Sequence, residues 1–146
     1  MKVCLFTYGT LMCPDIMADV SGLVERQLKF EPAVLHGYIR KQVAGCHYPA
    51  IVQPGLLPGY KDSAMPFVQG VLYSGMPPAV WQRLDRYEGS QYLRKKVTVV
   101  GANGETQIAM AYVFKSALVH SLSTNDWDFE KFKLVHKRNF VQQHGG

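Results

Sequence analysis

Short apolar runs, many of them rich in β-branched residues, make up much of the chain, with polar or glycine-containing stretches between them. Four of these runs have the length and composition of strands, at residues 2–6, 33–43, 48–53 and 67–75. Glycine interrupts two of them, at Gly37 and Gly70, which indicates a local irregularity in each predicted strand.

Residues 93–114 predict two further strands joined by a tight turn at Asn103-Gly104, because Asn-Gly is a favoured two-residue hairpin connection. A chain of many short strands with few helices between them favours a sheet that curls on itself. The pattern therefore predicts an α+β fold, a small mixed or antiparallel β-barrel flanked by a few helices.

Proline and glycine mark the ends of two predicted helices. The first begins at Pro14, a residue tolerated in the first turn of a helix, and ends near Gly22. The second begins after Pro77 and Pro78 and ends at Gly89, where a C-cap glycine is expected.

The last predicted helix spans residues 125–143, with Asn125 or Asp126 as its N-cap. Its apolar residues fall on two stripes, one made by Phe129, Phe132 and Phe140 and the other by Trp127, Leu134 and Val141. A helix that is apolar on two sides packs against more than one neighbour. We expect it to lie between the sheet and the loops; contact with a second copy of the chain is the alternative.

The segment Pro54–Pro66 is dense in proline and glycine and is long for a connection in a compact domain. Loops of this length are often lids or binding loops, so we expect it to cover a pocket. No repeat, low-complexity tract or change in composition divides the chain, so residues 1–146 are predicted to form a single domain.

The composition excludes several classes of protein. Apolar residues make up 47% and charged residues 18%, as in ordinary globular proteins. No apolar run reaches the roughly 20 residues that cross a bilayer, and the N-terminal residues lack the features of a signal peptide. We therefore expect a cytoplasmic protein without a membrane partner, either a monomer or a homodimer.

A net charge of +5 raises the question of nucleic-acid binding. The basic residues are scattered and accompany no nucleic-acid motif, so a solvated surface, or attraction of an anionic small molecule, is the preferred interpretation. The five histidines show no ligand spacing, and the three cysteines are an odd number without C-x-x-C spacing. A metal site is therefore not expected.

The helix before Gly89 places a carboxylate among apolar residues. At about 100° per residue, the arc that contains Trp81, Leu84 and Tyr87 also contains Glu88. Burial and the negative end of the helix dipole both raise the pKa of a carboxyl group at this position. Such a group can act as a general base and then as a general acid. The alternative is a terminal side chain that turns into solvent or pairs with a nearby cation, Arg94 or Lys95.

The stretch "TYGTL", Thr7 to Leu11, joins a predicted strand to a predicted helix. A glycine at this point allows a sharp turn, so that successive backbone N–H groups face one point and hold a carboxylate or an oxyanion. A simple connector is the alternative interpretation.

With these two stretches, the sequence resembles the γ-glutamylcyclotransferase-like superfamily, in particular its plant avirulence-induced-gene branch. "FTYGTLM" is similar to the N-terminal signature of that superfamily, and "LDRYEGSQYLRKKVTV" is similar to its LDxxEx…YxRxxVxV segment. "LHGYIRKQV…YPAIV", "VQGVLY" and "DWDFEKFKLVHKRNFV" follow in the matching order, so the resemblance runs from about Val3 to Val141.

The resemblance implies a fold, a reaction and site residues. The implied fold is a small mixed β-barrel flanked by helices. The implied reaction cyclises a γ-glutamyl amine or γ-glutamyl amino acid to 5-oxoproline and releases the free amine, without metal or cofactor. The catalytic Glu of the family falls on Glu88, and the loop that holds the glutamyl group falls on Tyr8, Gly9, Thr10, Leu11, Met12 and Cys13.

Other interpretations stay open at this point. Tyr92 either lines the substrate pocket or packs in the core. Cys46 and His47 suggest a thiol hydrolase, but neighbours on a strand point to opposite faces. Cys13 has no identifiable base. A protein that binds a small carboxylate in the same pocket without turnover is the alternative to the enzyme.

Overall fold

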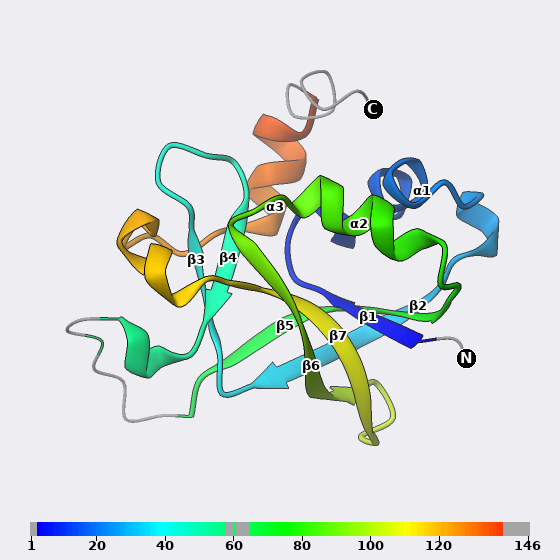
Figure 1. Ribbon diagram of the computed structural model, residues 1–146, viewed down its shortest axis with the longest axis horizontal. Helices are drawn as coiled ribbons and strands as arrows, with labels where there is room; N and C mark the ends of the chain where they lie inside the picture. Colours follow the sequence, from blue (N-terminus) through cyan, green and yellow to red (C-terminus); the bar gives the residue numbers. More distant parts are fainter. Residues whose placement is uncertain (1–2, 58–59, 61–64, 139–146) are drawn as a thin grey trace.

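In the computed structural model, which describes residues 3–57, 60 and 65–138, five of the strands close into a barrel. In barrel order they are β1 (Val3–Thr7), β5 (Phe67–Met76), β2 (Lys29–His36), β6 (Tyr92–Gly101) and β7 (Thr106–Phe114). Neighbouring strands are antiparallel except β7 and β1, whose parallel pairing closes the barrel at Leu5 and Met110. The predicted α+β barrel is confirmed (Figure 1).

The predicted strand at 33–43 is wrong as a single element. Gly37, at a φ of +84°, ends β2 in the barrel, and the chain then enters a separate antiparallel pair, β3 (Ile39–Gln42) with β4 (Pro49–Val52). A positive φ is readily adopted only by glycine, so Gly37 turns the chain out of one sheet and into the other. The Gly37 N–H is satisfied by the Pro66 carbonyl, at 2.9 Å.

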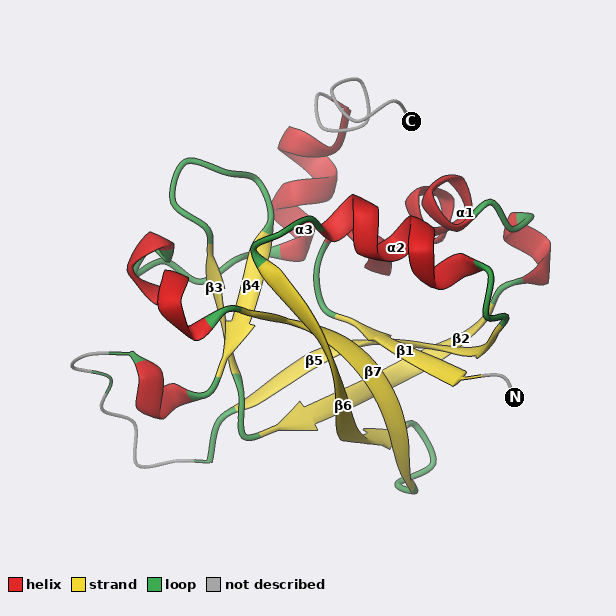
Figure 2. Cartoon of the chain, in the orientation of Figure 1, coloured by secondary structure: helices red, strands yellow, loops and turns green. Residues whose placement is uncertain are grey.

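The two longest helices lie together on one side of the barrel (Figure 2). Helix α1 (Pro14–Ser21) begins and ends where the sequence predicts and packs against α2 (Val80–Glu88). Four short 3₁₀ helices occur in the described chain, at Thr10–Met12, Glu25–Gln27, Pro54–Leu56 and Ser116–Ser121. None of the described helices combines the length and the apolar character needed to cross a lipid bilayer.

The C-terminal helix begins later than the sequence predicts. Its first residues form α3 (Phe129–Lys131), which continues as a π-helical stretch (Phe132–His136), and its N-cap is Asp128, which accepts the Lys131 N–H at 3.2 Å. Asn125 does not cap the helix, because its carbonyl accepts a hydrogen bond from the Gln42 N–H of β3, at 3.0 Å. Residues just before the helix are therefore held alongside β3.

The two predicted apolar stripes of this helix have different environments. Phe132 is buried, and so is Trp127, which lies before the helix and whose ring centre is 5.7 Å from that of Phe132. Leu134, within the helix, is 83% exposed, so the predicted packing on a second side does not extend along the described helix. Phe140 and Val141 lie outside the described residues.

The core has two parts. One fills the barrel with residues such as Phe6, Leu35 and Leu72. The other lies between the barrel, α1, α2 and the β3–β4 sheet, and includes Met17 and Leu84. The N-terminal turn after β1 and the end of α2 meet beside this second part.

Candidate active site

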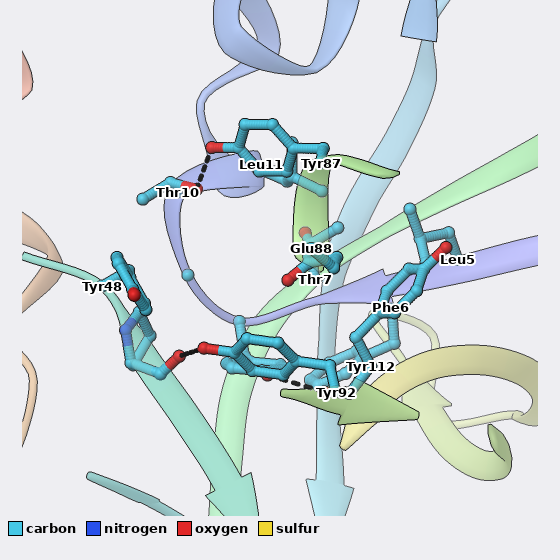
Figure 3. Close-up of a pocket in the computed structure, with 13 residues that line it drawn as sticks. Leu5, Phe6, Thr7, Thr10, Leu11, Tyr48, Tyr87, Glu88, Tyr92 and Tyr112 are labelled. Atoms are coloured by element: carbon cyan, nitrogen blue, oxygen red, sulfur yellow. Dashed lines mark hydrogen bonds between the residues drawn. The ribbon is translucent and has the colours of Figure 1, made fainter. Parts of the chain in front are cut away.

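A cavity of about 120 Å³ lies where the end of β1, the end of α2 and the start of β4 meet the barrel (Figure 3). The residues that line it are Leu5, Phe6, Thr7, Tyr8, Gly9, Thr10, Leu11, Tyr48, Pro49, Tyr87, Glu88, Tyr92 and Tyr112. Among these residues Glu88 alone carries a carboxyl group, and none carries a basic side chain. The wall is otherwise aromatic, aliphatic or hydroxyl-bearing.

Helix α2 carries Glu88 to this cavity. Val80 and Leu84, at 2% and 0% exposure, anchor the helix in the core, and Glu88 follows one turn after Leu84 on the same side. The helix stops immediately afterwards because Gly89, at a φ of +85°, donates its N–H to the Asp85 carbonyl at 3.0 Å and turns the chain away. Glu88 is therefore the last side chain that the helix presents to the cavity.

Burial raises the pKa of the Glu88 carboxyl from its ordinary 4.5 to about 8. Within the described residues, no cation pairs with this carboxyl group and no hydrogen bond reaches it. Arg94, the suggested partner, instead lies 3.3 Å from Asp85 and stacks over Trp81, 5.0 Å from the ring centre. The alternative in which Arg94 neutralises Glu88 is wrong.

Five tyrosines surround the carboxyl group in the described cavity. Burial raises the pKa of each hydroxyl, and the Glu88 charge raises each one further; the five are Tyr8, Tyr48, Tyr87, Tyr92 and Tyr112. The pKa of Tyr48 rises to about 12. All five hydroxyls consequently keep their protons at neutral pH.

The tyrosine hydroxyls also tie the walls of the cavity to one another. Tyr92 donates to the Pro49 carbonyl at 2.8 Å, and Tyr8 donates to the Tyr112 carbonyl at 2.6 Å. Tyr112 in turn donates to Asp85 Oδ1 at 2.6 Å, which fixes α2 against β7. The Tyr87 and Thr10 hydroxyls lie 2.8 Å apart, so the end of α2 also contacts the N-terminal turn.

Each carbonyl oxygen from Tyr8 to Leu11 already accepts a hydrogen bond from another group of the chain. The Tyr8 carbonyl accepts from Arg40 Nη1 at 2.9 Å, and the Leu11 carbonyl accepts from the Tyr73 hydroxyl at 2.7 Å. Between them, the Gly9 and Thr10 carbonyls accept from the N–H groups at the end of the 3₁₀ turn. No described residue accepts a hydrogen bond from the N–H of Gly9, Thr10 or Leu11. All three N–H groups belong to residues that line the cavity.

Close packing against the start of β4 also favours glycine at position 9. Its φ is −132°, so the turn does not need a left-handed residue. A Cβ atom at this position would instead lie 2.9 Å from the Cγ and Cδ atoms of Pro49. Glycine allows the turn to lie directly against the start of β4.

The structure places most of the candidate residues around one cavity. Tyr8, Gly9, Thr10, Leu11, Glu88 and Tyr92 all line the cavity, whereas Met12 and Cys13 are buried in the adjoining core. The substrate-binding role of each residue stays a prediction. Burial raises the pKa of the Cys13 thiol, which disfavours the thiolate needed for nucleophilic chemistry.

Sequence reasoning missed Tyr48, Pro49, Tyr87 and Tyr112 as cavity residues. The periodicity of α2 assigned Tyr87 to the apolar arc, and the alternation of β7 gave no sign that Tyr112 faces a cavity. Only Tyr48-Pro49, at the start of a predicted strand, carried a local signal of a chain turn.

The described residues do not support a pocket-covering role for the Pro54–Pro66 segment or a thiol-hydrolase role for Cys46 and His47. The described part of the Pro54–Pro66 segment contributes no residue to the cavity; Tyr60 and Met65 lie instead beside β3 and Trp127. Cys46 and His47 lie in the turn before β4 rather than on a strand. Among the described residues, no three His, Cys, Asp or Glu side chains cluster as metal ligands.

The chain is similar in sequence and in fold to known proteins. The chain is 31% identical over 139 residues to protein AIG2 C of Arabidopsis thaliana, across 94% of this chain and 76% of the relative. A solution structure of an Arabidopsis thaliana protein with 30% identity superposes with a TM-score of 0.70, covering 98% of this chain and 79% of that one.

A more distant structure, described as a gamma-glutamyl cyclotransferase, shares the fold with a TM-score of 0.60 at 18% identity, covering 79% of this chain and 68% of that one. The family described as "Gamma-glutamyl cyclotransferase, AIG2-like" matches residues 5–129, a range that contains the whole cavity wall. The chain therefore belongs to the AIG2-like family of gamma-glutamyl cyclotransferases.

Proposed function

We propose that the protein is a γ-glutamylcyclotransferase that converts a γ-glutamyl amine or γ-glutamyl amino acid into 5-oxoproline and the free amine. The observation that carries this proposal is the pairing of two features in one cavity: a carboxyl group with a raised pKa and a turn with three N–H groups, none of them bonded to a described residue. Family membership supports the same class of reaction.

The proposed chemistry uses only residues of the chain. Glu88, in its ionised form, takes a proton from the α-ammonium of the substrate, and the amine nitrogen attacks the γ-carbonyl carbon of the same molecule. A C–N bond forms, and the carbonyl oxygen becomes an oxyanion that the N–H groups of Gly9, Thr10 and Leu11 stabilise. The bond to the leaving nitrogen then breaks as Glu88 passes its proton to that nitrogen. The ring nitrogen still carries two protons, and it gives one of them to the regenerated Glu88 carboxylate, which passes it on to the released amine.

The raised pKa suits both proton transfers. A carboxyl group with a pKa of about 8 is a stronger base than a solvated glutamate, and after protonation it remains a competent acid at neutral pH. Ring closure is intramolecular, so a cavity that holds the glutamyl chain folded supplies much of the rate enhancement through orientation.

The test is incubation of the purified protein with a panel of γ-glutamyl amines, γ-glutamyl amino acids and γ-glutamyl peptides, with detection of 5-oxoproline. Glu88→Gln should reduce kcat by roughly 100-fold or more, the usual scale for a lost general base. Glu105→Gln removes an exposed carboxyl group from the β6–β7 turn and should keep full activity.

Absence of 5-oxoproline from every member of the panel would contradict the proposal. Binding of 5-oxoproline without turnover of any substrate would then favour the small-carboxylate binding protein. Full activity of Glu88→Gln would remove Glu88 from the mechanism.

A further inference from the structure

Arg40 contacts the turn of the candidate site from behind. It belongs to β3, outside the barrel, and does not line the cavity. Its Nη1 atom donates to the Tyr8 carbonyl at 2.9 Å and to the Gln69 carbonyl of β5 at 3.1 Å. One guanidinium group therefore links the small sheet, the barrel and the turn.

The guanidinium group also contacts Trp127, which lies just before the C-terminal helix. It lies 5.6 Å from the centre of the Trp127 ring, in cation–π geometry. The Trp127 ring is fixed in turn, because its Nε1 donates to the His47 carbonyl at 2.8 Å. Burial lowers the pKa of Arg40, but a guanidinium keeps its proton at neutral pH.

The peptide unit between Tyr8 and Gly9 transmits this contact to the cavity. Arg40 binds the carbonyl oxygen of this unit, and the N–H on its other end belongs to Gly9, a cavity residue. A cation on the carbonyl draws electron density toward the oxygen, and hydrogen bonds in such a chain strengthen one another. The contact therefore both orients the Gly9 N–H and makes it a stronger donor.

We propose that Arg40 is a positioning residue that aligns and polarises the Gly9 N–H as a donor to the oxyanion. This proposal rests on the proposed cyclotransferase function. Because the oxyanion exists only along the reaction path, loss of Arg40 should lower kcat more than it raises KM.

The experiment compares Arg40→Met with Lys41→Met. Lys41 is the next residue on β3 and contacts Asp126 at 2.6 Å and the Thr124 carbonyl at 3.4 Å, so its loss removes the same charge beside the same C-terminal segment. We expect Arg40→Met to reduce kcat by roughly 10- to 100-fold, less than or equal to the loss of one oxyanion donor. KM should change less than about threefold, and Lys41→Met should leave both constants close to wild type.

A second measurement does not depend on turnover. In ¹⁵N-labelled protein, the Gly9 amide proton should move upfield in Arg40→Met, because a less polarised N–H is a weaker donor. Addition of 5-oxoproline should then shift this amide less than it does in the wild type. Arg40→Lys, which keeps the charge but offers a point-like ammonium, should give an intermediate shift and an intermediate kcat.

An unchanged Gly9 amide in folded Arg40→Met would overturn the proposal. So would equal losses of kcat in Arg40→Met and Lys41→Met, since charge alone would then explain the effect. If the wild type turns over no γ-glutamyl compound, the proposed function fails, and the Gly9 amide shift still decides the effect of Arg40 on the turn.

Discussion

At the scale of a single residue, the environment of Glu88 predicts how activity depends on pH. Burial holds the pKa of this carboxyl near 8, so the ionised base becomes abundant only in mildly alkaline solution. In the free enzyme, kcat/KM should therefore rise with pH through an inflection near 8, far above the 4.5 of a solvated glutamate.

The corresponding profile of kcat should have its acid limb at lower pH. A bound substrate places its α-ammonium beside Glu88, and an opposite charge favours the ionised carboxyl group. Initial rates at limiting and at saturating substrate, corrected for uncatalysed cyclisation, separate the two limbs. An inflection in kcat/KM near the ordinary value of 4.5 would show that water or a cation solvates Glu88 in the free enzyme.

The same residue also makes folding stability depend on pH. Its pKa is higher in the folded chain than in the unfolded chain, so the folded state keeps a proton that the unfolded state releases between about pH 5 and pH 8. The wild type should lose stability as pH rises through this window, by at most about 1.4 kcal/mol per pH unit from this group.

Glu88→Gln removes this titration, so its stability relative to the wild type should increase across the window. Urea unfolding at a series of pH values measures the difference in the free energy of unfolding. A constant difference between the two proteins would mean that Glu88 titrates normally in the folded state.

At the scale of elements, the contact between the N-terminal turn and β4 depends on the missing side chain of Gly9. Gly9→Ala places a methyl group 2.9 Å from two ring atoms of Pro49, so either the turn or β4 must move. We expect a loss of about 1–3 kcal/mol in the free energy of unfolding, as for other overpacked sites. Turnover should fall as well, because the N–H groups of the turn would be displaced.

Gly55→Ala is the matched control for this substitution. Gly55 lies in the Pro54–Leu56 turn, where an added Cβ atom would have no neighbour within 4 Å among the described residues, so alanine should be neutral or slightly stabilising. Thermal unfolding and turnover of the two variants make the comparison. Equal behaviour of Gly9→Ala and Gly55→Ala would mean that the turn and β4 are not tightly packed.

At the scale of the whole molecule, barrel closure relies on Gly70 in β5. A Cβ atom at this position would meet the Thr7 carbonyl oxygen of β1 and lie 2.7 Å from Cζ of Phe6. The neighbouring β1–β5 and β2–β5 ladders have no room to separate here without losing hydrogen bonds.

Gly70→Ala should therefore destabilise the fold by roughly 3 kcal/mol or more, at the upper end of overpacking effects. The loss should appear in the global unfolding transition, since β5 connects both neighbouring strands of the barrel. Chemical denaturation against the Gly55→Ala control measures it. A loss below about 1 kcal/mol, within the range tolerated at loose sites, would contradict this account of closure.

Local sequence determined the features that depend on neighbouring residues. The spacing of Val80, Leu84 and Glu88 follows from the period of a helix, and the helix ends follow from proline and glycine. The Asn103-Gly104 signal identified the β6–β7 hairpin and, with the order of the elements, the barrel class. The connection itself is longer than the two residues predicted, because β6 ends at Gly101 and β7 begins at Thr106. These features need no knowledge of distant contacts.

Tertiary structure alone decided which distant residues meet. The N-cap of the last helix is Asp128 rather than Asn125, because the Asn125 carbonyl accepts a hydrogen bond from the distant Gln42 N–H of β3. Tyr48 and Tyr112 reach the Glu88 cavity only because β4 and β7 lie beside it, and Arg40 reaches the turn only because Gly37 sends β3 out of the barrel. Local periodicity specifies the face on which a side chain lies, whereas its partner across the fold is set by strand pairing and core packing, which no local pattern encodes.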